Sequence, residues 1–160
     1  IPQAEDAARL ITPRTRAIVL VSPNNPGGVE YPAETLAAFR DVCRAHDLAL
    51  IVDETYRDFD ARTGRPHDLF ADPDWHDTLI QLYSFSKAYR LTGHRVGAIV
   101  ASTARLAEVE KFLDTVAICP SQLGQIGALW GMRNLAQWVA GERDEILARR
   151  AAMVLSLIHI

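Results

Sequence analysis

The sequence predicts an α/β fold with three layers: a mainly parallel sheet that includes one antiparallel strand, followed by C-terminal helices. Continuous apolar runs at 17–21, 48–52 and 78–83 are typical of strands covered on both faces. A segment with helical spacing separates the first two runs, so strand, helix and strand form a βαβ unit, which is almost always right-handed. A fourth apolar run, 97–101, follows after a short connection, which suits an antiparallel neighbour.

The helices are predicted from apolar residues at helical spacing. Residues 3–11 read as a helix that ends at Thr12-Pro13, and Pro32 is well placed to begin a helix that runs to residue 46. Residues 57–77 are polar and read as a loop with short irregular elements. A helix over 103–116 should turn its apolar residues inward, and 121–155 should be largely helical with a break near Gly141. The inward residues of the two clearer helices are Leu36, Phe39, Val42, Cys43 and His46, and then Leu106, Val109, Phe112, Leu113 and Val116.

Composition excludes several classes of function. The 160 residues are 49% hydrophobic and 23% charged, which is enough for one sizeable core. A net charge of -3 gives no electrostatic signature for nucleic acid or an anionic membrane, and no apolar run approaches membrane-spanning length. The two cysteines, Cys43 and Cys119, lack the spacing of a metal or redox site. We therefore expect no metal, reduced thiols and a cytoplasmic protein.

Polar residues follow three of the predicted strands. The first strand runs into Ser22–Gly28, a segment rich in turn formers that projects Asn25, the second ends at Asp53, and Lys87 follows the third. The carboxyl ends of parallel strands share one edge of a sheet, so these three side chains should converge. Two alternatives stay open: Asn25 could cap its own turn, and Asp53-Glu54 could serve Mg²⁺ in a P-loop ATPase, although no Gly-x-x-x-x-Gly-Lys-Ser/Thr is present.

Lys87 is the better of two candidates for amine chemistry. The chain has two lysines, and Lys111 lies on an amphipathic helix where a solvated cation is expected. Ser84-x-x-Lys87 could be the motif of a serine acyltransferase, but the partner motifs Ser-Asp-Asn and Lys-Thr-Gly do not occur. The other interpretation makes Lys87 a Schiff-base lysine and assigns Ser84, Ser86 and Arg95 to a phosphate. Only the second interpretation uses every polar residue of the stretch.

These motifs resemble those of the class I and II aminotransferases, which are fold-type I pyridoxal-phosphate enzymes. The resemblance covers residues 1 to about 154 and implies part of the large domain and the helix that leads to the small domain. It implies that Lys87 binds pyridoxal 5'-phosphate and acts as the general base, and that Asp53 pairs with the ring nitrogen. Asn25 and Tyr56 would hydrogen-bond the phenolic oxygen, and Ser84, Ser86 and Arg95 would hold the phosphate. The matching segments are Asn25-Pro26-Gly27-Gly28, Asp53-Glu54-Thr55-Tyr56, Ser84-Phe85-Ser86-Lys87 and Gly93-His94-Arg95-Val96-Gly97.

Two positions depart from the family pattern. Gly28 replaces a larger residue, and Arg90 places a bulky cation where a small residue is usual. We expect Arg90 to reach solvent or another subunit, with a substrate carboxylate as the alternative.

The resemblance implies an enzyme that moves an amino group between an amino acid and a 2-oxo acid, as a homodimer when full length. A carbon–sulfur lyase or a decarboxylase on the same fold is one alternative, and a non-catalytic sensor domain of a transcription regulator is another. The ring-stacking aromatic residue should precede residue 1, and the arginine that binds the substrate carboxylate should follow the end, so this chain alone should be inactive. Residues 155–160 interrupt the charged helical pattern and read as a translated sequencing adapter outside the native protein.

Overall fold

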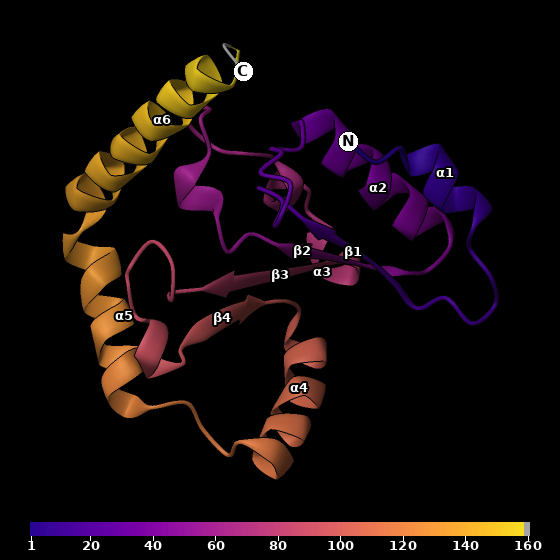
Figure 1. Cartoon of the computed structure of the whole chain (residues 1–160). Helices are drawn as coiled ribbons and strands as arrows, with labels where there is room; N and C mark the ends of the chain where they lie inside the picture. The colour runs from indigo at the N-terminus through magenta and orange to yellow at the C-terminus, as the bar shows by residue number, and fades with distance from the viewer. Residues whose placement is uncertain (159–160) are drawn as a thin grey trace.

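A four-stranded sheet with the order β1-β2-β3-β4 forms the centre of the computed structural model, which describes residues 1–158 (Figure 1). The strands are β1 Ala17–Val21, β2 Ala49–Asp53, β3 Leu79–Ser84 and β4 Gly97–Val100. β1, β2 and β3 are parallel, and β4 is antiparallel to β3. This arrangement confirms the predicted mainly parallel sheet with one antiparallel strand.

Two helices cover one face of the sheet. α2 (Ala33–Ala45) lies against β1 and β2, and α1 (Ala4–Arg9) packs on α2 (Figure 1). α2 turns its apolar stripe onto the sheet, where the side chains of Leu36, Phe39 and Cys43 are buried together with Leu50 and Val52. Continuous apolar strands and an amphipathic crossover helix thus produce the main core, as the sequence pattern predicts. His46 is the exception, because it is the exposed C-cap of α2.

A second layer lies on the opposite face. Gln81 of β3 pairs in register with Val52 of β2, whose side chain faces α2, so Gln81 points to the same face. Side chains alternate along a strand, so the next residue, Leu82, points to the opposite face. Leu82 and Ile99 line a groove of about 800 Å³ together with α4 (Thr103–Val116). The sheet therefore has helices on both faces, in agreement with the predicted three layers.

The inward packing predicted for α4 is wrong for this chain. α4 contains no buried residue, and the side chains of Phe112 and Val116 are 66% and 64% exposed. Within residues 1–158 no element covers that apolar surface, and β4 is an edge strand of the sheet. The helix itself forms where predicted because Ser102 caps it, its side chain accepting a hydrogen bond from the N–H of Arg105.

The segment between β2 and β3 contains only short elements, as expected. These are 3₁₀ helices at Arg57–Phe59 and Leu69–Ala71 and the one-turn helix α3 at Trp75–Thr78.

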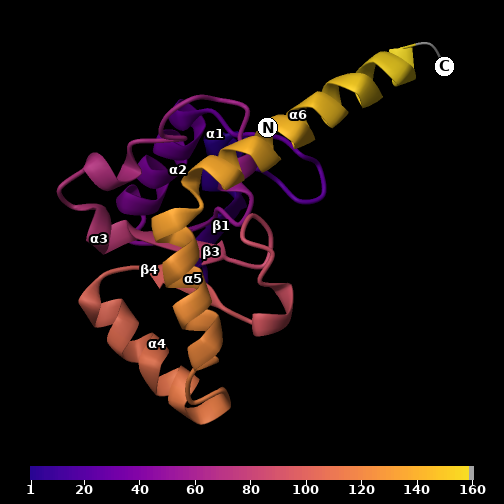
Figure 2. The ribbon, with the colours of Figure 1, turned by 90° about the vertical axis from the view of Figure 1, so that its left-hand side faces the viewer.

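The C-terminal region forms two helices, α5 (Gln122–Asn134) and α6 (Ala136–Ile158), and the second half of α6 projects away from the rest of the molecule (Figure 2). The predicted break near Gly141 is wrong. The helices separate at Leu135, and Gly141 lies inside α6, where its missing side chain faces open space. Residues 155–158 continue α6, and the rest of the predicted adapter segment lies outside the described residues. No helix within 1–158 is both long enough and apolar enough to cross a membrane.

Candidate active site

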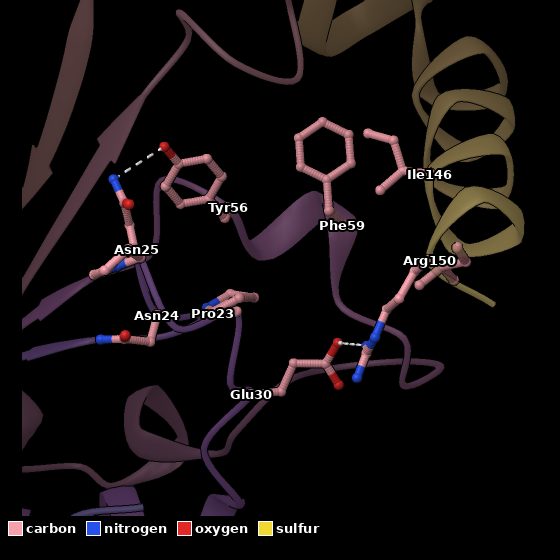
Figure 3. Close-up of a pocket in the computed structure, with 11 residues that line it drawn as sticks. Pro23, Asn24, Asn25, Glu30, Tyr56, Phe59, Ile146 and Arg150 are labelled. Carbon is pink, nitrogen blue, oxygen red and sulfur yellow. Dashed lines mark hydrogen bonds and ion pairs between the residues drawn. The ribbon is translucent and has the colours of Figure 1, made fainter. Parts of the chain in front are cut away.

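The loop after β1 presents Asn25 at the carboxyl edge of the sheet. The side-chain oxygen of Asn24 accepts a hydrogen bond from the N–H of Gly27 at 3.1 Å, and Gly28 has a left-handed φ of 67° that suits glycine. The loop is therefore capped by Asn24. The side chain of Asn25 instead points across the edge and donates to the hydroxyl of Tyr56 at 3.4 Å (Figure 3).

The end of β2 fixes Asp53 between two neighbouring strands. The N–H of Ser22 donates to the carbonyl of Asp53 at 3.0 Å, and the N–H of Glu54 donates to the carbonyl of Leu82 at 2.9 Å. One carboxylate oxygen of Asp53 accepts the N–H of Thr55 at 2.9 Å. The backbone pairing on both sides leaves the carboxylate at the strand end, one residue before a short turn that carries Tyr56.

Lys87 lies next to Tyr56. Its Nζ is 5.7 Å from the centroid of the Tyr56 ring, and its side chain is exposed. Asn25, Tyr56 and Lys87 therefore form one contiguous group, although they come from three different strand ends. The sequence predicts that Asn25, Asp53 and Lys87 converge; the structure brings Asn25 and Lys87 to the same residue, Tyr56, which lies three residues after Asp53.

The turn around Lys87 carries the proposed phosphate ligands. The N–H of Ser86 donates to the hydroxyl oxygen of Ser84 at 3.3 Å. The hydroxyl of Thr92 donates to the carbonyl of Ser86 at 2.9 Å, and the guanidinium of Arg95 donates to the carbonyl of Thr92 at 3.0 Å. Ser84, Ser86 and Arg95 thus belong to one bonded loop, where Thr92 links the guanidinium to Ser86.

A glycine joins this loop to the sheet. Gly97 pairs with Ser84, and a Cβ on it would lie 2.8 Å from the carbonyl oxygen of Tyr83. Any larger residue would push β4, and Arg95 with it, away from β3.

A buried carboxylate, Glu54, lies directly after Asp53 at the end of β2. The Glu54 side chain is 1% exposed, and it contacts His67 Nε2 at 2.9 Å and Arg57 at 3.4 Å and accepts a hydrogen bond from Gln81. This network was not predicted from the sequence. The signal that could have indicated it was Gln81, because a polar side chain within an apolar strand needs a buried hydrogen-bond partner.

α5 and α6 hold the outer side of the Lys87 turn. A Cβ on Gly131 would lie 2.8 Å from the Tyr89 ring, so this glycine allows α5 to approach closely. Arg90 bonds to Glu142 on α6, and its guanidinium carbon lies 5.2 Å from the centroid of the Trp138 ring. The expectation that Arg90 reaches solvent or another subunit was incomplete, because its side chain, 68% exposed, also contacts α6 of the same chain.

An open pocket of about 390 Å³ lies beside Tyr56. The loop after β1, Tyr56, Phe59 and α6 line it, and Glu30 and Arg150 lie 3.5 Å apart at one end (Figure 3). No group of three or more histidine, cysteine, aspartate or glutamate side chains within 1–158 is arranged to hold a metal ion.

Residues 2–160 match the protein family described as aminotransferase class I and II. The chain belongs to this family. It is 43% identical, over 119 residues, to the arginine–pyruvate transaminase AruH of Pseudomonas aeruginosa, a match that covers 73% of this chain and 28% of that protein. It is 36% identical over 121 residues to the valine–pyruvate aminotransferase of Mycobacterium tuberculosis, covering 74% of this chain and 30% of the relative.

Solved structures of aminotransferases share the fold. The N-succinyldiaminopimelate aminotransferase of M. tuberculosis superposes with a TM-score of 0.90 at 26% identity, over 99% of this chain and 41% of that one. The aspartate aminotransferase of Thermus thermophilus with maleate gives 0.88 at 26% identity, over 99% and 42%. The chain therefore spans less than half the length of these relatives. All of them are aminotransferases, and none favours the lyase, decarboxylase or regulator alternatives.

The donor set fits the cofactor that this family implies, pyridoxal phosphate. A primary amine lies beside a phenol and an amide, a carboxylate ends the neighbouring strand, and two hydroxyls and a guanidinium share one loop. These groups match, in kind, an aldehyde, a phenolic oxygen, a ring nitrogen and a phosphate.

Proposed function

We propose that the full-length protein is a pyridoxal-phosphate-dependent aminotransferase that moves an amino group between an amino acid and a 2-oxo acid. The observation that carries the proposal is the contact of Lys87, Tyr56 and Asn25 at the carboxyl ends of parallel strands. Membership of the aminotransferase family supports it.

When bound, pyridoxal phosphate supplies an electron-withdrawing ring that makes the α-proton of an amino acid labile. Lys87 would hold the cofactor through Nζ and, once released by an incoming amine, would accept and return the α-proton at that nitrogen. Asp53 would keep the ring nitrogen protonated. Asn25 and Tyr56 would donate to the phenolic oxygen.

Ser84, Ser86 and Arg95 would bind the phosphate. The planar guanidinium of Arg95 suits bidentate recognition of phosphate oxygens, and the loop bonds through Thr92 restrict its position. The phosphate of the cofactor would therefore be bound by a loop that is attached to the sheet. Lys87 would not be needed for phosphate binding and could exchange its bond to the cofactor for one to the substrate amine.

The experiment is to reduce the full-length holoenzyme with borohydride and to map the modified peptide. We expect the label on Lys87, and Lys87→Ala should abolish both labelling and amino-group transfer. Lys111→Ala is the matched control, because Lys111 is an exposed lysine paired with Glu108 at 2.6 Å on α4. A label on Lys111 or on any other lysine would refute the assignment.

Arginine with pyruvate is the first substrate pair that we propose, and valine with pyruvate is the second. The support is the identity to relatives with those names, 43% and 36%. Transfer rates measured over a panel of amino acids and 2-oxo acids test both pairs. If neither pair reacts faster than the rest of the panel, the substrate assignment is wrong even where the reaction type holds.

We also propose a cytoplasmic homodimer, in which residues 1–154 belong to the cofactor-binding large domain and the helix leading to the small domain. The family resemblance supports the dimer, and the two unpaired cysteines are compatible with a reducing compartment. Light scattering of the full-length protein tests the dimer, and fractionation of the source cells tests the location.

A further inference from the structure

Arg90 has a backbone conformation that disfavours its own side chain. Its φ is 55°, in the left-handed region where a Cβ crowds the following carbonyl oxygen. Its N–H donates to the carbonyl of Lys87 at 3.0 Å and so closes the turn that presents the lysine. A glycine would adopt this conformation more readily, so the arginine needs another explanation.

The side chain of Arg90 makes two contacts on one face of α6. It forms an ion pair with Glu142 and lies over the ring of Trp138, four residues earlier and therefore one helical turn away. The Glu142 side chain is only 31% exposed, so the pair is partly shielded from water. A cation–π contact and an ion pair that share one guanidinium fix its position better than either alone.

α6 also contacts the segment that carries Tyr56. The helix packs against Arg57–Phe59, which begins directly after Tyr56, and Ile146 and Leu147 line the pocket next to Phe59. The same helix therefore touches both the segment that follows Tyr56 and, through Arg90, the Lys87 turn.

We propose that Arg90 is a positioning residue: it fastens the Lys87 turn to α6 and so holds Lys87 Nζ over the Tyr56 ring. The catalytic importance of that position rests on the proposed function. The turn is also held by the hydrogen bond from Thr92 to Ser86 and by apolar packing: Tyr89 and Leu91 pack in the cluster of Phe85 and Val96 and approach Gly131 and Gly127 of α5. These contacts fix the turn against the sheet and α5, whereas Arg90 sets its distance from α6.

The test uses the full-length protein loaded with pyridoxal phosphate and compares Arg90→Gly with Glu142→Gln. Arg90→Gly removes the contacts with α6 and also relieves the backbone, so Tm should stay the same or rise. Amide exchange in the peptide 86–92 should nevertheless become about fivefold faster, equivalent to about 1 kcal/mol at 1.36 kcal/mol per factor of ten. The absorbance band of the bound cofactor should shift, and kcat should fall more than KM changes.

Glu142→Gln should change exchange and absorbance in the same direction by less, because the contact with Trp138 survives. Adding it to Arg90→Gly should have no further effect, since the two residues act through one contact. The matched control is Glu145→Gln, which breaks the 2.8 Å pair with Arg149 on α6 and should change neither readout.

The proposal would be overturned if amide exchange and absorbance in both Arg90→Gly and Glu142→Gln equalled those of wild type. It would also be overturned if Glu145→Gln changed them as much as Glu142→Gln does. If Arg90→Gly does not fold, Glu142→Gln decides alone. Failure of the proposed function is a separate result: Lys87 would then not be the residue trapped by borohydride, while the exchange comparison would still show whether Arg90 links the turn to α6.

Discussion

Replacing Glu54 with alanine is expected to loosen the segment that follows β2. The carboxylate is 1% exposed and has three partners: His67, Gln81 and Arg57. The N–H of Leu69 donates to His67 Nδ1 at 3.2 Å, so His67 Nε2 carries a hydrogen and donates to Glu54 at 2.9 Å. The network is therefore satisfied only while position 54 offers two acceptor oxygens.

The cost follows from the groups that alanine would leave behind. The Nε2–H of His67 and the amide of Gln81 would remain buried without an acceptor, at about 1–3 kcal/mol each. Arg57 would also lose its ion-pair partner, but its side chain is 37% exposed, so water can replace the carboxylate and this loss adds little, about 0–1 kcal/mol. Taking about 3 kcal/mol, local opening should become about 150-fold more frequent at 1.36 kcal/mol per factor of ten.

Native-state amide exchange of the full-length protein measures this opening. The reporting N–H groups belong to Arg57, Phe59 and Asp60, which donate to the carbonyls of Glu54, Tyr56 and Arg57 at 3.0, 3.0 and 3.2 Å. Their exchange should become faster, while exchange in α1, on the far side of α2, should stay near wild type.

The exchanged pair Glu54→Gln with Gln81→Glu is the sharpest control. Glu54→Gln alone should also speed amide exchange, because the new side-chain NH2 group would face a donor, either the NH2 of Gln81 or the Nε2–H of His67. The double variant restores one acceptor and one donor between the two positions and should recover part of the loss. An increase below about tenfold in Glu54→Ala, or no recovery in the double variant, would refute the reasoning about hydrogen-bond satisfaction.

Further predictions concern the cofactor site, a buried thiol and the extent of the chain. Asp53→Ala should still bind cofactor but slow α-proton removal about a thousandfold, since a close ion pair at an effective dielectric near 20 is worth about 4 kcal/mol; half-reaction rates near wild type would contradict this. Burial raises the pKa of the Cys43 thiol to about 11, above its ordinary value of 9.0. The resulting stabilisation is complete below pH 9 and is lost as the pH rises from 9 to 11, and iodoacetamide at pH 8 should label Cys43 at least about 100-fold faster in denaturant than in the folded protein. The 160-residue chain alone, supplied with pyridoxal phosphate, should show no amino-group transfer above the free-cofactor background, and turnover that Lys87→Ala abolishes would show otherwise. Resequencing the locus should show that the genomic reading frame diverges after Val154, and a genomic Leu-Ser-Leu-Ile-His-Ile would disprove the adapter origin of residues 155–160.

The sheet could be predicted because its signals are local. The runs at 17–21 and 48–52 are apolar throughout and the run at 78–83 is mostly apolar. The β1–α2–β2 connection has few alternatives once its hand is set. Strand order predicts that Asn25 and Lys87 lie at one edge of the sheet together with the end of β2, whereas the part played by Tyr56 comes from the family resemblance. The chemical roles assigned to these residues are still predictions.

Other features depend on contacts between distant segments. His67 lies in an irregular loop, so its bond to Glu54 has no signal in the local pattern. The helix break at Leu135 also has no local sequence signal, because neither Asn134 nor Ala136 is a strong helix breaker. Gly141 is a stronger helix breaker, so the break is predicted there. The apolar face of α4 was correctly recognised as apolar, but a hydrophobic pattern does not say which segment covers it.

The glycines of α5 affect the order in which this region can fold. Gly124, Gly127 and Gly131 lie on one helical face against His94, Leu91 and Tyr89. Each glycine in a helix interior costs about 1 kcal/mol relative to alanine, so α5 should not be helical in isolation. We expect it to gain its helical form by docking on the loop that follows Lys87, whose own hydrogen bonds offer a preformed surface. The helical form of α5 is thus coupled to the loop that carries the lysine, and a variant that loosens this loop should also fray α5.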